Sequence, residues 1–87
     1  MYWVYMLKDI ANNLYIGITE DVEKRLAYHN QRRGALFTKH GTFRIVFTEK
    51  HVNITDARKR EIQIKKWRRE KKETLIERYK NGLPTKS

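Results

Sequence analysis

The segment from residue 4 to residue 17 constrains the fold of this chain more than any other. It contains two apolar runs, at 4–7 and 14–17, which are separated by a polar stretch that includes Asn12-Asn13. β-Branched and aromatic residues favour extended strands, and asparagine tolerates the left-handed backbone that tight turns require. The pattern therefore predicts a β-hairpin whose two strands are joined by a short turn.

Each predicted strand of the hairpin carries one tyrosine, Tyr5 or Tyr15. If the turn pairs Tyr5 with Gly17, Tyr15 lies diagonally across from Tyr5 on the same face, with about 7–8 Å between the backbones. Gly17 has no side chain, so the two phenols would meet beside a space that a ligand can enter. The alternative is a core hairpin in which both tyrosines only fill space.

The rest of the chain adds one predicted strand and three predicted helices. The run at residues 2–7 shows no clear alternation, which is typical of a strand covered on both faces and central in a small sheet. Thr19 and Thr55 are the predicted N-caps, and Gly34 and Gly82 are expected just past helix ends. The predicted strands are 2–7, 14–18 and 43–48, and the predicted helices are 20–32, 56–69 and 70–80.

Length and composition limit the class of protein. The 87 residues suffice for one small domain, which we place at residues 1–82 and follow with a short flexible tail at residues 83–87. The chain contains no cysteine and no long apolar run. We therefore expect no disulfide, no signal peptide, no membrane contact and a cytoplasmic location.

The charge balance indicates a polyanionic partner. The chain has 20 Lys and Arg against 10 Asp and Glu, which gives a net charge of +10. Such an excess is typical of proteins that bind nucleic acid. An anionic membrane is disfavoured as the partner, because the basic segments lack the broad apolar face of an interfacial helix. The alternative is a basic surface that only keeps the protein in solution.

Two ionisable residues border the apolar stripe of the first predicted helix. Val22 and Leu26 form an apolar i, i+4 pair, and Arg25 and His29 form a second pair beside it. Ionisable groups seldom lie next to a buried stripe without a partner, so a functional role is one interpretation. The alternatives are a histidine hydrogen-bonded at the core edge and an arginine that pairs with a carboxylate such as Asp21.

Glu61 is the most informative carboxylate in the chain. It follows Ala57 by four residues and precedes Ile64 by three, so it points along the inward stripe of the helix predicted at 56–69. A carboxylate on an otherwise basic inward surface is what a divalent cation needs as an anchor. The alternative is an intrahelical ion pair with Lys65 or Arg58, which contributes only a few tenths of a kcal/mol.

Basic residues are concentrated in the same part of the chain. Nine of the 20 Lys and Arg lie between residues 58 and 72, and they would form a ridge that faces phosphates. The alternative is a solvated helix face. Including one lysine of the loop after the first helix, the candidate nucleic-acid contacts are Lys39, Arg58, Lys65, Lys66, Arg68 and Arg69.

The order of these features resembles the GIY-YIG nuclease family over essentially the whole chain. The second family motif is present as Tyr15-Ile16-Gly17, and the first reads Val4-Tyr5-Met6, with valine and methionine in place of glycine and tyrosine. Arg25 and His29 follow on the first helix, and Glu61 follows on a later one. The chain looks like the small stand-alone bacterial members of that family.

The resemblance implies an α+β fold with a three-stranded antiparallel sheet flanked by about three helices. It also implies metal-dependent endonuclease cleavage of a phosphodiester in nucleic acid, with DNA favoured over RNA. Glu61 would hold one divalent ion, Mg²⁺ or Mn²⁺, Arg25 would neutralise charge on the phosphate, and Tyr5 would orient or deprotonate the attacking water. His29 would accept the phenolic proton of Tyr5, and Tyr15 would be hydrogen-bonded in the same cluster. Gly17 would let the backbone of the second strand come close to the site.

The reaction needs this set of groups on physical grounds. A phosphodiester resists attack because it is negatively charged, so a metal ion and a guanidinium must offset that charge. A tyrosine is a poor base at neutral pH, because its usual pKa is about 10. It needs a positive field and a proton acceptor, which Arg25, the metal ion and His29 would provide.

Some features depart from the family pattern or leave alternatives open. Ile18 stands where some relatives carry a polar residue, and Asn81 is the only candidate for a late asparagine. A zinc site is disfavoured, since His29, His40 and His51 lack the spacing of metal ligands. The main alternative function is a binding module of the same fold that contacts nucleic acid without cutting it. In either case a protein partner is a possible source of specificity.

Overall fold

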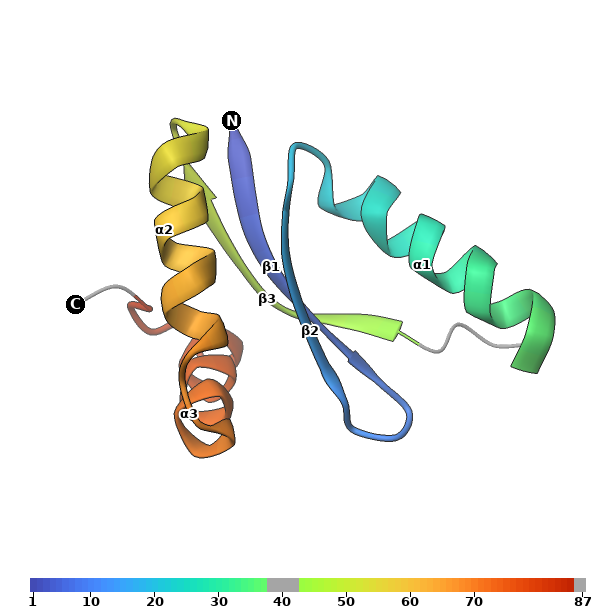
Figure 1. The fold of residues 1–87 in the computed structure, drawn as a ribbon. Helices are drawn as coiled ribbons and strands as arrows, with labels where there is room; N and C mark the ends of the chain where they lie inside the picture. The colour runs from blue at the N-terminus through green and yellow to red at the C-terminus, as the bar shows by residue number, and fades with distance from the viewer. Residues whose placement is uncertain (38–42, 86–87) are drawn as a thin grey trace.

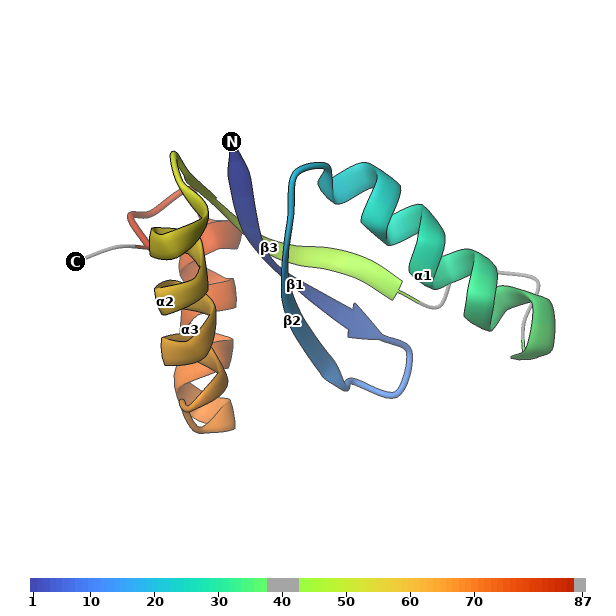
Figure 2. The same ribbon diagram turned by 45° about the horizontal axis from the view of Figure 1, so that its top comes forward.

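A computed structural model describes residues 1–37 and 43–85 of the chain. Three strands form an antiparallel sheet with the order β2-β1-β3, so the strand predicted to be central is central. Figures 1 and 2 show α1 on one side of the sheet and α2 and α3 together on the other. The elements are β1 (Tyr2–Asp9), β2 (Leu14–Thr19), α1 (Val22–Phe37), β3 (Phe43–His51), α2 (Ile54–Lys65) and α3 (Arg69–Lys80).

The β1–β2 hairpin has the predicted register, with Tyr5 opposite Gly17. Its turn contains Asn12 with a φ of 72°, the left-handed conformation for which asparagine is suited. Asp9 stabilises this turn, because its carboxylate accepts hydrogen bonds from the backbone N–H groups of Ala11 and Asn13, both at 2.9 Å. The hairpin prediction is therefore confirmed in its strands, its turn and its pairing.

The alternation of side chains along β1 gives the sheet two separate cores. Val4 and Met6 are fully buried against α2 and α3, together with Phe47, Ala57 and Ile64. On the other face, Tyr5, Leu7 and Phe43 pack with apolar residues of α1, including Val22 and Leu26. Both faces of the central strand are thus covered, which explains its unbroken apolar sequence.

Helix α1 begins and ends later than predicted. The Asp21 carboxylate, not the Thr19 hydroxyl, caps the helix by accepting a hydrogen bond from Lys24 N at 3.1 Å. The Thr19 hydroxyl instead accepts from Asp21 N at 3.1 Å and shapes the turn between β2 and α1. The helix continues through Gly34 to Phe37. A single glycine lowers helix stability by only about 1 kcal/mol, so Gly34 alone is not a stop signal.

The second half of the chain also differs from the prediction in its caps. Asn53 caps α2 by accepting a hydrogen bond from Asp56 N at 2.9 Å, so the predicted cap at Thr55 is wrong. The helix ends at Lys65, and Trp67 lies in the turn before α3 rather than on a continuous helix to residue 69. Helix α3 ends as predicted, because Gly82 adopts a φ of 70° just past its last turn.

A buried carboxylate joins β3, α2 and the segment after α3. The Glu49 side chain is 5% exposed, and it accepts hydrogen bonds from Arg60 Nε at 2.9 Å and from the Thr85 hydroxyl at 3.0 Å. Arg60 also donates to Thr85 O at 2.7 Å, while Arg78 donates to Pro84 O at 2.7 Å. These contacts hold residues 84–85 against α2 and α3. The predicted division into a domain at residues 1–82 and a flexible tail at residues 83–87 stays a prediction.

Candidate active site

The candidate site is built around the absence of a side chain at Gly17. Tyr5 projects from the central strand across Gly17 of β2, and the residue is 6% exposed. A Cβ atom at position 17 would lie 2.5 Å from the Tyr5 hydroxyl oxygen and 2.7 Å from Cζ. Only glycine therefore allows this path for the phenol.

Arg25 of α1 and Glu61 of α2 act on the same phenol from elements that lie on opposite sides of the sheet. Burial raises the pKa of Tyr5, the positive charge of Arg25 lowers it, and the negative charge of Glu61 raises it further. The net effect is a pKa above the ordinary value of tyrosine. Tyr5, Arg25 and Glu61 thus come close enough to influence one another electrostatically, and Arg25 alone does not offset the burial.

Glu61 lies at the border of the core, as its spacing predicts. Its side chain is 14% exposed, and its carboxylate oxygen lies 3.0 Å from Lys65 Nζ, one turn later on α2. The ion-pair alternative is therefore present in the structure. The Lys65 side chain is 53% exposed, so it compensates the charge of Glu61 without covering it from solvent.

Arg25 is exposed, and its guanidinium lies 5.8 Å from the centre of the Tyr28 ring. Its backbone N–H donates to Asp21 O at 3.1 Å, but the predicted alternative of a side-chain ion pair with Asp21 is wrong. Within the described part of the chain the Arg25 guanidinium forms no ion pair. The guanidinium is thus available to an anion.

The aromatic ring of Phe43 contacts both His29 and Tyr15. Its centroid lies 5.3 Å from that of His29 and 5.2 Å from that of Tyr15. The Tyr15 hydroxyl donates to Asp9 Oδ2 at 3.0 Å, which ties this phenol to the hairpin turn. The predicted hydrogen bond of Tyr15 within the catalytic cluster stays a prediction.

Asp9 and Phe43 support the candidate site but were not singled out from the sequence. Asp9 carried a usable signal, since an aspartate before an asparagine-rich turn commonly bonds the backbone two residues on. The contact of Phe43 with residues of β2 and α1 is tertiary, so no local pattern indicates it.

A cleft of about 640 Å³ lies beside the candidate site, where the end of β2, the start of α1 and the start of α2 meet. Arg58, one turn before Glu61 on α2, lines it together with Arg25 and Lys24. Two carboxylates, Glu20 and Asp21, lie on the same wall, so the cleft is basic overall. Tyr5 and Glu61 do not line the cleft, and Arg25 is the residue that the cleft shares with the candidate site.

The other predicted nucleic-acid contacts have different surroundings. Lys66 and Arg68 are exposed between α2 and α3. Arg69 donates to Asn12 O at 2.6 Å and to the Glu73 carboxylate at 2.7 Å, so part of its hydrogen-bonding capacity joins α3 to the hairpin turn. Lys39 lies outside the described residues.

The donor set limits the kind of metal site that this surface can offer. No group of three or more His, Cys, Asp or Glu side chains able to hold a metal ion occurs in residues 1–37 and 43–85. Glu61 is a single carboxylate, one turn after the cleft residue Arg58 on α2. Such a donor fits Mg²⁺, which keeps several waters and is commonly held by one or two carboxylates plus phosphate oxygens.

Tyr5, Arg25 and Glu61 thus come together from β1, α1 and α2. The model of the GIY-YIG catalytic domain matches residues 1–74. The chain therefore belongs to the GIY-YIG family.

Individual relatives agree with this placement. The chain is 37% identical over 76 residues to a UPF0213 protein of Staphylococcus saprophyticus, covering 86% of this chain and 93% of the relative. It is 40% identical over 77 residues to a UPF0213 protein of Clostridium perfringens, covering 87% and 83%. The solution NMR structure of the UPF0213 protein BH0048 from Bacillus halodurans is similar with a TM-score of 0.60 and 34% identity, covering 88% of this chain and 84% of that one. Within the described residues, no helix is long and apolar enough to cross a membrane.

Proposed function

We propose that this chain is a metal-dependent endonuclease that hydrolyses phosphodiester bonds in nucleic acid, with DNA as the favoured substrate. Family membership supports a nuclease-type activity in general. The observation that supports the particular reaction is the electrostatic meeting of Arg25 and Glu61 at the Tyr5 phenol, which reaches them across Gly17.

In this proposal the scissile phosphate binds at the inner end of the basic cleft. Arg25 is exposed, and within the described chain its guanidinium makes no hydrogen bond, so its donors can bind the phosphate oxygens. Arg58 and Lys24 line the same cleft and would contact the flanking phosphates. The substrate would thus be held along the cleft with one phosphate next to Tyr5.

Glu61 would hold the divalent ion, Mg²⁺ or Mn²⁺. When bound, that ion supplies positive charge to a non-bridging phosphate oxygen. The Lys65 ammonium, which now lies 3.0 Å from the carboxylate, would have to move aside. Its side chain is half-exposed, so it can turn toward solvent and contact a phosphate instead.

Tyr5 would place the attacking water. Because burial and the negative charge of Glu61 keep its pKa above the ordinary value, the free protein carries a protonated phenol at neutral pH. The phenol would first orient the water through a hydrogen bond. It would then pass its proton to His29 and take one from the water as the water attacks phosphorus, while the P–O bond to the leaving group breaks and the leaving oxygen takes a proton from solvent.

The test is metal-dependent cleavage of labelled DNA and RNA in duplex, branched and single-stranded forms. We expect Glu61→Gln and Arg25→Gln each to lower the rate by about 10²–10³-fold, the usual loss when one charge-stabilising group is removed. Glu70→Gln is the matched control, because Glu70 is an exposed carboxylate on α3 away from the cleft. Circular dichroism and thermal unfolding would check that each variant keeps its fold.

Cleavage that persists in the Glu61→Gln variant, or that needs no divalent ion, would rule out this mechanism. The second candidate is a binding module that does not cut, and the Lys65 ion pair with Glu61 favours it, because that pair occupies the proposed metal ligand. Binding without cleavage across the whole panel would support this candidate. In both cases binding should weaken steeply as the salt concentration rises, since counterions are released from the phosphates.

A further inference from the structure

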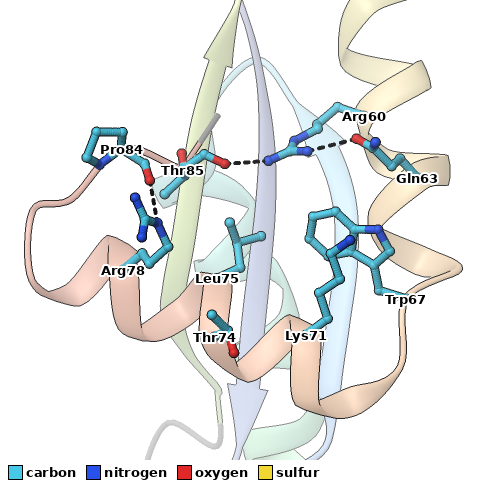
Figure 3. Close-up of a pocket in the computed structure, with 9 residues that line it drawn as sticks. All are labelled: Arg60, Gln63, Trp67, Lys71, Thr74, Leu75, Arg78, Pro84 and Thr85. Carbon is cyan, nitrogen blue, oxygen red and sulfur yellow. Dashed lines mark hydrogen bonds between the residues drawn. The ribbon is translucent and has the colours of Figure 1, made fainter. Parts of the chain in front are cut away.

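A second groove lies between α2, α3 and the segment at residues 84–85 (Figure 3). Its volume is about 370 Å³, which is within the range of about 300–1,000 Å³ that small-ligand sites occupy. Hydrogen bonds from Arg60 to Thr85 O and from Arg78 to Pro84 O hold its outer wall in place. Its main lining residues are Arg60, Trp67, Lys71, Leu75, Arg78 and Pro84.

The groove combines cations with an aromatic ring. Lys71 Nζ lies 4.4 Å from the centre of the Trp67 ring, and Arg60 Cζ lies 5.2 Å from it. Leu75 and Pro84 add apolar surface. None of the described residues that line the groove is a carboxylate. The lining therefore fits an anion that carries a flat, weakly polar ring.

The cations of the groove differ in how far the fold already uses them. Arg60 is committed to Glu49, Gln63 and Thr85. Arg78 bonds Pro84 through Nε, and its two terminal nitrogens make no hydrogen bond within the described chain. The Lys71 ammonium likewise contacts only the Trp67 ring there. Lys71 and Arg78 can thus both donate to a bound phosphate.

Helix α2 places this groove and the candidate active site on opposite sides of its core stripe. At about 100° per residue, Ala57 and Ile64 face the sheet, Arg58 and Glu61 lie on one flank, and the groove stripe lies on the other. The groove stripe consists of Arg60 and Gln63, and Trp67 continues it in the turn that follows α2. The outward face between the two flanks carries the exposed Lys59, and the exposed Lys66 follows at the C-cap of α2. A strand that leaves the cleft can therefore follow basic residues across α2 to the groove.

We propose that this groove binds one unpaired nucleotide of a nucleic-acid strand, with its phosphate on Lys71 and Arg78 and its base against Trp67. The proposal rests on the proposed function, because the strand is the one that passes the candidate active site. The nucleotide must be unpaired, since the faces of a base inside a duplex are covered by its stacked neighbours and cannot contact a side chain. The groove would thus favour substrates with a single-stranded flank over blunt duplexes.

Trp67 itself reports on the proposed contact. The chain has two tryptophans, so a Trp3→Phe variant leaves Trp67 as the only one. We would titrate this variant, without divalent ion, with a short 5′-phosphorylated single-stranded DNA, a blunt duplex of equal length, a mononucleotide and inorganic phosphate. We expect the single strand to change Trp67 emission and to bind at least about tenfold more tightly than the duplex, because only the single strand can stack a free base on the Trp67 ring.

Substitutions in the groove separate a specific site from general charge. Lys71→Gln with Arg78→Gln should weaken binding of the single strand about tenfold or more, whereas Lys80→Gln, an exposed cation of α3 outside the groove, should change it little. Thr74→Glu is the second variant. It adds a negative charge at an exposed helical position of the groove lining, and it should abolish the emission change without disturbing a core residue.

The outcomes separate this inference from the proposed function. An emission change that Thr74→Glu removes while Glu61→Gln retains it supports the groove, whether or not the protein cuts. A response to inorganic phosphate or mononucleotide equal to that of the single strand overturns the proposal that the ligand is part of a strand. Unchanged Trp67 emission, or equal binding of strand and duplex, overturns the groove even if metal-dependent cleavage is found.

Discussion

Replacing Gly17 with alanine tests whether the Tyr5 phenol depends on the missing side chain. The new methyl group would lie 2.5 Å from the hydroxyl oxygen, 2.7 Å from Cζ and 3.0 Å from Cε2 of Tyr5. Ordinary van der Waals contact begins at 3.4 Å, so the rigid ring must move by about 1 Å. Tyr5 is buried and packs with apolar residues such as Leu7 and Phe43, so neighbouring side chains must move with its ring.

The size of the effect follows from two opposing contributions. Overpacking of a buried site costs about 1–3 kcal/mol, whereas alanine is favoured over glycine in a strand by about 0.5–1 kcal/mol. The free energy of unfolding should therefore fall by about 1–2 kcal/mol, which lowers Tm by about 5–15 °C for a domain of this size. If the proposed function holds, a 1 Å displacement of the phenol should also lower the cleavage rate by about 10²-fold.

Urea denaturation and thermal unfolding of the wild type, Gly17→Ala, Tyr5→Ala and the double variant would measure this coupling. In the Tyr5→Ala background the clashing ring is absent, so the same glycine substitution should be neutral or stabilising. Equal destabilisation by Gly17→Ala in both backgrounds would show that the cost does not arise from the phenol. Unchanged stability in the wild-type background would refute the packing argument altogether.

Three further substitutions test other parts of the fold. Burial alone would raise the pKa of Glu49. Arg60 outweighs this effect through its hydrogen bonds and its positive charge, so the pKa of Glu49 is lowered. This contribution to stability is therefore fully present above the unfolded glutamate pKa of about 4.3, and it is lost as the pH falls through the lower pKa of the folded state. In urea denaturation measured from pH 7 to pH 2, the midpoint of Glu49→Gln should therefore fall less at acidic pH than that of the wild type. Asp9→Ala should lower the free energy of unfolding by about 2–3 kcal/mol in urea titrations, because it removes the carboxylate to which the Tyr15 hydroxyl and two turn N–H groups donate. Gly82→Ala should cost about 1 kcal/mol in the same titrations, since its φ of 70° disfavours a side chain while no atom lies within 4 Å, and Gly82→Asn should recover most of that loss.

The hairpin and the central strand were predictable because their signals are local. A two-run apolar pattern with a turn-forming pair of asparagines specifies both the strands and the register, and the register places Tyr5 opposite Gly17. The inward position of Glu61 was predictable for a similar reason, since its spacing from Ala57 and Ile64 fixes its direction on a helix.

The helix starts were not predictable to the residue, because each contains two residues that can cap. Thr19 and Asp21 compete before α1, and Asn53 and Thr55 compete before α2. The choice depends on where the preceding strand ends, which is a property of the sheet. The Glu49–Arg60 ion pair was missed although Glu49 alternates with the buried Phe47 on β3, because its partner comes from another element.

The central place of β1 also affects how the chain folds during synthesis. The hairpin can form as soon as β2 has left the ribosome, but the second edge of β1 has no partner until His51 has been added. At about 5–20 residues per second, roughly 2–6 s pass between the end of β2 and the end of β3. During this interval a two-stranded ribbon, which is only marginally stable in water, has one unpaired backbone edge on β1, and its Val4 and Met6 side chains are not yet covered by α2 and α3. The nascent chain should therefore be most prone to aggregation, and most in need of a chaperone, before its third strand arrives.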